Sequence, residues 1–215
     1  MSSERIIDTP HGEGRLVTDR ARTTMATLLL SHGAGGGIDA RDLEALAHHL
    51  PRNGITVVRF EQPWRRAGRK IAGPPPTLDD GLRAAANALR GRTPLVIGGR
   101  SAGARSAARS AHALGAAGCL ALSFPLHPPG RPEKSRLDEL TGSRLPTLVI
   151  QGEKDTFGLP EEFPADTELC VVPGADHGLK VPARGPVSQQ EAMDIVVEAT
   201  LEWVVREIAG NAASA

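Results

Sequence analysis

The sequence contains no tyrosine, and aromatic residues make up only 3% of its 215 residues. The core must therefore be built from Leu, Val, Ile and Ala rather than from aromatic rings. Hydrophobic residues account for 40% and charged residues for 23%, which is ordinary for a folded globular chain. This length suffices for one domain with a sizeable core, so we expect a single domain over residues 1–210 and a disordered tail over residues 211–215.

Net charge is also absent, because 25 Lys and Arg residues balance 25 Asp and Glu residues. A neutral chain lacks the field that attracts proteins to nucleic acid or to anionic membranes, so we expect neither as a partner. No apolar run approaches the ~20 residues that span a bilayer. The polar first five residues are not followed by the apolar core of a signal peptide. Together these absences predict a cytoplasmic protein.

Cysteine is scarce, with only Cys119 and Cys170, and each stands within a short apolar run. Two buried, unreactive thiols are favoured over a disulfide or a metal pair. His48 and His49 are adjacent on a predicted helix, where neighbouring residues do not share a face. The sequence offers no cluster with metal-ligand spacing and no dinucleotide motif in context, which predicts activity without a metal or cofactor.

Short apolar runs alternate with segments of helical periodicity along most of the chain. One helix is predicted to begin with a capping box of Thr77 and Asp80, and a long helix closes the domain. Apolar strands that alternate with helices indicate an α/β fold, with a mostly parallel sheet covered on both faces. Two short antiparallel strands are expected within the first twenty residues. The other strands are predicted at residues 25–31, 55–60, 94–98, 119–123, 147–151 and 168–172.

The segment GRSAG, residues 99–103, joins one of these strands to an Ala-rich helix. Ligands bind beyond the carboxyl ends of parallel strands, so this junction is well placed for chemistry. A sharp strand-to-helix turn lifts the hydroxyl of Ser101 clear of the backbone, and Gly99 and Gly103 allow the close packing that the turn requires. The helix N-terminus adds positive potential near a developing oxyanion. A glycine-rich helix start is the alternative interpretation.

An acid and a histidine follow two later strands of the predicted sheet. Asp155 comes after strand 147–151 and His177 comes after strand 168–172. Serine, acid and histidine in this chain order, each at a strand end, are typical of hydrolases with a nucleophile elbow. The histidine accepts the serine proton, and the acid fixes the imidazole tautomer. Glu153 and Asp176 compete for the acid role, although Glu153 fits a solvated loop and Asp176 fits a turn cap.

The glycine-rich segment HGAGGG, residues 32–37, follows the strand at 25–31. Its position predicts an oxyanion hole formed by the backbone N–H groups of Ala34 and Ala102. We expect His32 to hold the loop shape rather than to take part in catalysis, although it is also a candidate contact for substrate. Phosphate binding is a weaker interpretation, because the segment lacks the Lys-Ser/Thr ending of a phosphate-binding loop.

Three further features bear on substrate recognition. The basic run over residues 65–70, which includes Arg66 and Arg69, either binds an anionic group of the substrate or forms a solvated loop. His127 either lines the pocket or stabilises a turn. The Pro-rich stretch over residues 125–145 contains about one helix of sequence, which predicts little or no lid and a shallow, open site.

Taken together, LLLSHGAGGG, PW…GRKIAGPPPTLDD, GGRSAGAR, FPLHPPG, QGEKDTFG and GADHGL resemble one compact branch of the α/β-hydrolases, related to the dienelactone-hydrolase-like group. That branch includes bacterial predicted hydrolases, a testis-expressed vertebrate protein and the hydrolase-like portion of a non-specific-lethal chromatin complex subunit. The resemblance covers nearly the whole chain and implies a single-domain α/β-hydrolase fold with the triad Ser101, Asp155 and His177. Typical dienelactone hydrolases carry Cys where this chain has Ser101, so their specificity does not transfer.

These features predict a serine hydrolase that cleaves a small carboxylic ester, with a small molecule as substrate, which is anionic if the basic run binds it. A peptidase or a thioesterase could use the same residues. The alternative from another class is a binding or scaffold protein with a vestigial site, which the chromatin-complex relative makes a real contender. The oligomeric state does not follow from the sequence.

Overall fold

The computed structural model describes residues 2–89, 91 and 93–210, so the predicted tail at 211–215 lies outside the described residues. Eight strands form one sheet in the order β1-β2-β4-β3-β5-β6-β7-β8. The pairs β1–β2 and β2–β4 are antiparallel and all others are parallel, as predicted. Their bounds are β1 (Ser2–Thr9), β2 (Gly12–Asp19), β3 (Ala26–Ser31), β4 (Ile55–Glu61), β5 (Leu95–Arg100), β6 (Gly118–Leu122), β7 (Thr147–Gly152) and β8 (Glu168–Val172).

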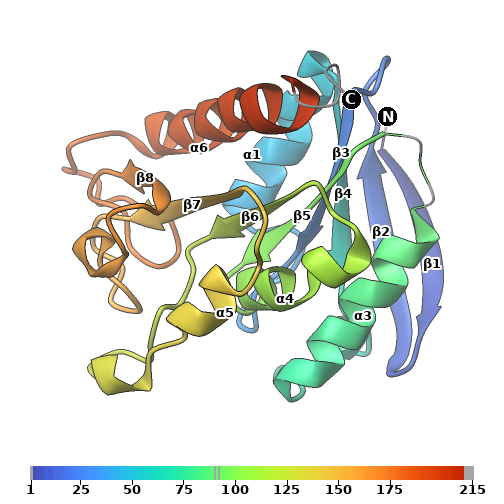
Figure 1. Ribbon diagram of the computed structural model, residues 1–215, viewed down its shortest axis with the longest axis horizontal. Coiled ribbons are helices and arrows are strands. Elements are labelled where there is room, and N and C mark those ends of the chain that lie inside the picture. The colour runs from blue at the N-terminus through green and yellow to red at the C-terminus, as the bar shows by residue number, and fades with distance from the viewer. Residues whose placement is uncertain (1, 90, 92, 211–215) are drawn as a thin grey trace.

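Helices cover both faces of the sheet. The α-helices are α1 (Arg41–His49), α2 (Pro63–Arg66), α3 (Pro75–Ala88), α4 (Ala102–Ser110), α5 (Leu137–Thr141) and α6 (Gln189–Trp203). Figure 1 shows α1 and α6 together on one side of the sheet and α3, α4 and α5 on the other. Short 3-10 turns cover Leu50–Asn53, His112–Leu114, Pro132–Lys134 and Pro160–Glu162, and a π-helical turn covers Val204–Ala209. The result is a single-domain α/β-hydrolase fold.

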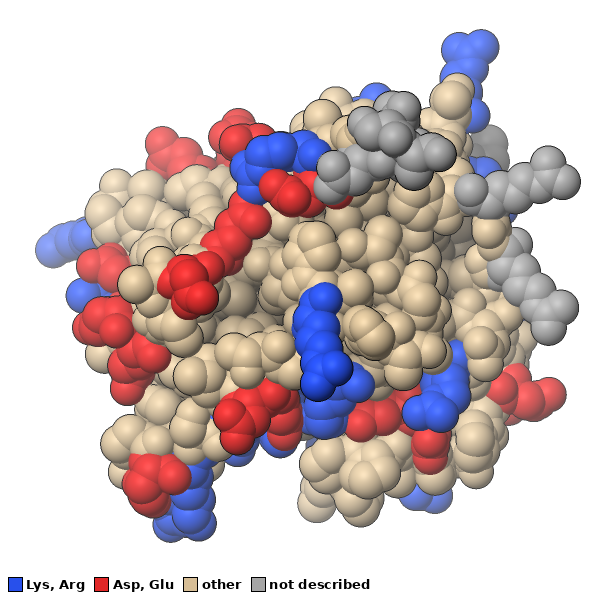
Figure 2. Space-filling view, in the orientation of Figure 1, with Lys and Arg blue, Asp and Glu red and all other residues tan. Residues whose placement is uncertain are grey.

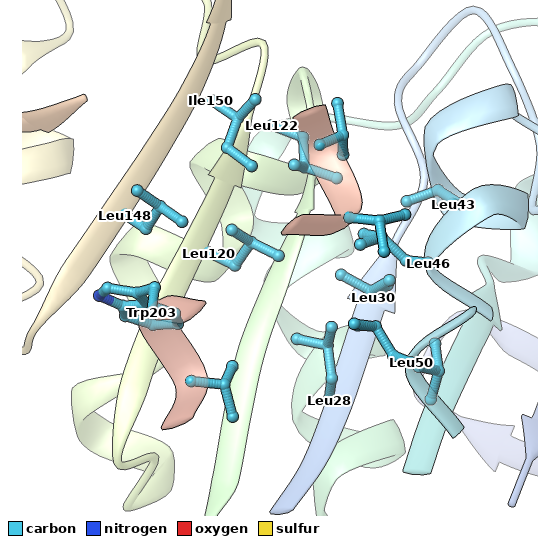
Figure 3. Packing of buried hydrophobic residues seen from close by; sticks show 14 of the residues in the cluster. Leu28, Leu30, Leu43, Leu46, Leu50, Leu120, Leu122, Leu148, Ile150 and Trp203 are labelled. Carbon is cyan, nitrogen blue, oxygen red and sulfur yellow. The ribbon is translucent and has the colours of Figure 1, made fainter. Parts of the chain in front are cut away.

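The core consists largely of branched aliphatic side chains. Beneath α1 and α6, leucines of β3 and β6 pack against leucines of α1 and against Trp203 (Figure 3). A second cluster on the opposite face contains Phe60 and Phe124 among Leu, Val and Ala residues. Because both faces of the inner strands are covered, their sequences are apolar throughout rather than alternating. These continuous aliphatic runs make the strands predictable in a sequence that is poor in aromatic residues.

The beginning of α3 differs from the prediction. The helix begins at Pro75, and Thr77 does not cap it, because its hydroxyl donates instead to the carbonyl of Pro74 at 2.7 Å. Proline suits the first helical position, since its φ is already fixed and its missing N–H would have no partner there. A capping box with a hydroxyl residue stands at α6, where Ser188 accepts from the N–H of Glu191 and the Glu191 carboxylate accepts from the N–H of Ser188.

The segment between β6 and β7 contains only α5 and one 3-10 turn, so no lid subdomain interrupts residues 123–146. Both cysteines are free thiols. Cys119 is buried as predicted, and burial raises its pKa to about 12. Cys170 is only half-buried, because β8 is the edge strand of the sheet, and the prediction of full burial was wrong there.

Charged side chains of both signs lie on the face seen in Figure 2. No helix within the described ranges is long and apolar enough to cross a membrane.

Candidate active site

Ser101 stands alone between the end of β5 at Arg100 and the start of α4 at Ala102. Its φ of 53° and ψ of −114° lie outside the regions that most side chains adopt, so the turn holds backbone strain. A Cβ built on Gly99 would lie 2.5 Å from the carbonyl oxygen of Ser31, and one on Gly103 would lie closer still to the same atom. Both glycines of the motif are therefore required by the close approach of β3.

A continuous hydrogen-bonded chain joins the three predicted residues. Ser101 Oγ lies 2.9 Å from His177 Nε2, and His177 Nδ1 lies 2.8 Å from Asp155 Oδ2. A carboxylate can only accept, so Nδ1 donates to Asp155 and Nε2 is left to accept the serine proton. The Asp155 side chain is completely buried, whereas 22% of the His177 side chain is exposed. The imidazole is thus open to solvent on one side while the carboxylate is shielded from water.

The Asp155 carboxylate accepts two further hydrogen bonds. Gln151 Nε2 donates to Oδ2 at 2.9 Å, and the N–H of Phe157 donates to Oδ1 at 2.9 Å. The same Gln151 amide also donates to the carbonyls of Phe124 and Gly158. Sequence reasoning missed Gln151, although a polar residue in a buried strand four positions before the acid was an available signal.

The competing acids have other partners. Glu153 accepts from the N–H of Gly174 at 2.6 Å, and this hydrogen bond holds its pKa below the ordinary value. Asp176 caps its own turn, because Oδ1 accepts from the N–H groups of Gly178 and Lys180 at 2.7 and 3.0 Å. Neither carboxylate hydrogen-bonds to the His177 ring, which leaves Asp155 as its acid partner.

Phe157 provides a contact that the sequence did not reveal. Its ring stacks on the His177 imidazole with centroids 4.2 Å apart and an interplanar angle of 27°. Stacking restrains rotation of the imidazole and covers one of its faces from water. The position two residues after Asp155 was visible in the sequence, but nothing there indicated the direction of the ring.

The glycine-rich loop after β3 lies against the elbow. A Cβ on Gly33 would be 3.2 Å from both the Arg100 carbonyl and Ser101 Cβ. His32 is buried, with Nδ1 donating to the Gly33 carbonyl at 2.8 Å and Nε2 accepting from the N–H of Gln62 at 3.1 Å. Burial lowers the His32 pKa, which favours the neutral ring that this pattern needs. The geometry fits a residue that shapes the loop and leaves neither nitrogen for substrate.

The N–H groups of Ala34 and Ala102 remain the predicted oxyanion donors. Within the described part of the chain neither amide donates to another residue. Ala102 begins α4, where the first N–H groups of a helix have no partner inside the helix. Both donors are therefore available for an oxygen atom of a ligand.

The remaining candidate contacts have partners away from the triad or point outward. Arg66 forms an exposed ion pair with Glu13 at 3.1 Å, and Arg69 is exposed with no side-chain partner among the described residues. His127 hydrogen-bonds through Nδ1 to the Pro128 carbonyl at 2.9 Å and through Nε2 to Glu162 at 3.1 Å. No hydrogen bond or ion pair of the described residues joins these three side chains to Ser101 or His177.

In the described ranges no three His, Cys, Asp or Glu side chains gather closely enough to hold a metal ion. Three surface cavities lie on other parts of the molecule and are not lined by Ser101, Asp155 or His177.

The fold and this elbow define the chain as a member of the α/β-hydrolases. Residues 24–205 match the model of the alpha/beta hydrolase domain family, and the chain belongs to that family.

Several solved structures share the fold. A lidless α/β serine hydrolase from Xanthomonas campestris is similar with a TM-score of 0.70 and 23% identity, over 94% of each chain. Est1E from Butyrivibrio proteoclasticus is 16% identical with a TM-score of 0.72, over 95% of this chain and 100% of that one. Dienelactone hydrolase from Anabaena variabilis is also 16% identical with a TM-score of 0.72, over 97% and 98%. At these identities the similarity shows the fold.

Proposed function

We propose that this chain is a serine hydrolase that cleaves a small carboxylic ester through an acyl-enzyme. The Oγ of Ser101 attacks the ester carbonyl carbon while His177 Nε2 takes the hydroxyl proton. The N–H groups of Ala34 and Ala102 donate to the oxyanion that forms. The carbon–oxygen bond to the alcohol then breaks, and His177 returns the proton to the departing alkoxide.

The second half of the cycle repeats these steps with water. His177 accepts a proton from a water molecule as the water oxygen attacks the acyl carbon. The bond to Ser101 Oγ breaks, Oγ recovers the proton, and the carboxylic acid leaves. Asp155 holds the imidazole in the required tautomer throughout and stabilises the imidazolium that forms twice per turnover.

The observation that carries the proposal is the hydrogen-bonded chain from Asp155 through His177 to Ser101, with distances of 2.8 and 2.9 Å, on a strained turn. Strain at Ser101 persists only because the surrounding packing imposes it, and such strain is concentrated at functional sites.

The short segment between β6 and β7 supports a small substrate, because no lid subdomain encloses a long acyl chain. Est1E is known with ferulic acid bound, so a protein of the same fold accommodates a compact carboxylic acid. We further infer that the chain belongs to the branch that includes the testis-expressed protein and the chromatin-complex subunit. The motifs quoted above support that inference.

Reaction with a fluorophosphonate probe tests the proposal. Labelling of the wild-type protein, with the modified peptide containing Ser101, is expected. Asp155→Asn should slow the labelling and Ser101→Ala should abolish it. A folded wild-type protein that is never labelled would favour a binding protein with a vestigial site.

A further inference from the structure

The side chain of Arg100 joins the nucleophile elbow to two other segments. Its Nη2 donates a 2.7 Å hydrogen bond to the backbone carbonyl of His177. Its Nε lies 3.3 Å from Oδ2 of Asp42, in the first turn of α1. The Asp42 side chain is fully buried, and that of Arg100 is 17% exposed. No hydrogen bond of the described residues links either side chain to Ser101 Oγ or to the His177 ring.

We propose that Asp42 and Arg100 are positioning residues that hold His177 in register with Ser101, an inference that rests on the hydrolase mechanism proposed above. Arg100 immediately precedes Ser101 in the chain. Its contact with the His177 carbonyl therefore ties the backbone of the base to the backbone of the nucleophile. The guanidinium is a rigid planar group, so its hydrogen bond from Nη2 can fix this distance while the ion pair with Asp42, at 3.3 Å, anchors its other side.

The turn that carries His177 needs such an attachment. Residues 173–180 are closed internally, because Asp176 caps the turn through Gly178 and Lys180. The turn is attached to the loop of the acid by a 2.8 Å hydrogen bond from the N–H of Lys154 to the Ala175 carbonyl. Among the described residues, its hydrogen bonds to the elbow are the Arg100 contact and the Ser101–His177 pair itself. Without Arg100, the Ser101–His177 hydrogen bond would be the remaining one of these two links between the turn and the elbow.

The carboxylate of Asp42 compensates the positive charge that Arg100 places near His177. A lone cation beside His177 would oppose formation of the imidazolium, and the carboxylate of Asp42 offsets that charge. Burial raises the pKa of Asp42, and the charge of Arg100 acts in the opposite direction. The charge of Arg100 thus supports the charged form of Asp42, whose side chain is fully buried.

Arg109, in α4, provides a matched control. Its side chain is 22% exposed and pairs with Asp79 and Glu139 at 2.7 and 2.8 Å. These contacts join α3, α4 and α5, and they do not involve the triad. Loss of Arg109 therefore removes ion pairs of comparable exposure that do not touch the residues of the triad.

The first measurement compares kcat and KM for a small neutral ester in Arg100→Met and Arg109→Met. Displacing a base by about 1 Å can cost on the order of 10² in rate, so we expect kcat of Arg100→Met to fall about 10- to 100-fold. Its KM should stay within about twofold, because substrate contacts are unchanged. Arg100→Lys should recover part of the loss, since an ammonium donates to the carbonyl but cannot also pair with Asp42 in the same way. Arg109→Met should lose thermal stability and keep its kcat.

The second measurement does not depend on activity. The NMR signal of the His177 Nδ1 proton, assigned with His177→Gln, should be sharp in the wild type and in Arg109→Met. It should broaden or disappear in Arg100→Met and, to a smaller extent, in Asp42→Asn. If Arg100→Met does not fold, Asp42→Asn and Arg100→Lys decide the matter by the same measurements.

The outcomes separate the two proposals. A wild type that neither hydrolyses esters nor reacts with fluorophosphonate contradicts the proposed function, while the proton signal still tests the positioning role. Unchanged kcat and an unchanged proton signal in folded Arg100→Met would overturn the positioning role. Equal losses of kcat in Arg100→Met and Arg109→Met would overturn it as well, because the effect would then be one of general stability.

Discussion

Two regions at the carboxyl edge of the sheet are built in contrasting ways. The acid–base loops, residues 151–158 and 173–180, contain polar groups with buried partners, and the Asp155 carboxylate alone accepts from Gln151, Phe157 and His177. The basic loop, residues 64–70, is anchored by buried Trp64, but its Arg66 and Arg69 are exposed. A buried polar group must find partners inside the protein, whereas an exposed charge is satisfied by water in any direction. The positions of buried Asp155 and half-buried His177 could therefore be inferred from sequence order, whereas the directions of the exposed arginines could not.

The strongest test of this contrast is Ser101→Ala. Loss of a triad member costs on the order of 10⁴ to 10⁶ in kcat, and we expect a loss of that size. The alanine also sits at a strained φ of 53°, so the protein should remain folded but is not expected to gain stability. Ester hydrolysis with circular dichroism as the folding control measures both effects. A folded variant with more than a few per cent of wild-type activity would show that Ser101 is not the nucleophile.

The next largest effect distinguishes the three acids. Asp155→Asn should lower kcat by about 10⁴, because the amide favours the wrong imidazole tautomer. Glu153→Gln and Asp176→Asn serve as controls and should each lower kcat by less than about tenfold, since they stabilise turns rather than the His177 ring. Steady-state kinetics of the three variants at one pH is sufficient. A larger loss in either control than in Asp155→Asn would move the acid role to that residue.

The parts of the site that the sequence predicted are those that depend on chain order and strand ends. Ser101, Asp155 and His177 each follow a parallel strand, and parallel strands bring such positions to one edge. Arg100 and Phe157 escaped prediction because their roles depend on side-chain direction. An arginine after a strand is usually solvated, and nothing in a single sequence indicates that it turns toward the His177 carbonyl.

Helix starts were harder to predict for a related reason. A hydroxyl three residues before an acid fits a capping box at both Thr77 and Ser188, and only Ser188 forms one. At Thr77 the preceding run of prolines begins the helix earlier. The local pattern was the same, and the backbone preference of proline decided between the two positions.

A smaller, pH-dependent effect on stability is expected at His127, whose ring hydrogen-bonds to Glu162. The Pro128 carbonyl and then Glu162 raise the pKa of His127, while the Leu159 N–H and then His127 lower the pKa of Glu162. A raised His pKa contributes stability below its unfolded value that is lost as pH rises through the folded value. A lowered Glu pKa contributes stability above its unfolded value that is lost as pH falls through the folded one. The pair should therefore contribute most between about pH 4.3 and about pH 6.5.

Urea unfolding of His127→Gln at about pH 5.5 and about pH 8.5 measures this contribution. The free energy of unfolding lost on substitution should be greater at the lower pH. The difference should stay below about 1 kcal/mol, since a third of the Glu162 side chain is exposed and solvent screens the pair. His11→Gln, which breaks an exposed pair with Asp80, should cost little at either pH. Equal losses for His127→Gln at the two pH values would show that the ion pair with Glu162 does not contribute to stability.

The smallest expected effect concerns the basic loop and an anionic substrate. The side chain of Arg69 has no hydrogen-bond or ion-pair partner among the described residues, whereas the charge of Arg66 is partly offset by Glu13 at 3.1 Å. If the loop contributes a local field, Arg69→Ala should raise KM for an anionic ester by about twofold to threefold at low salt. Arg66→Ala should raise it less, and a neutral ester of similar size should respond to neither substitution. Because exposed charges are screened over about 10 Å at 0.1 M salt, the difference between the esters should shrink as salt is added. An equal response of both esters to salt, with no selective effect of Arg69→Ala, would leave the basic loop as a solvated surface segment with no part in recognition.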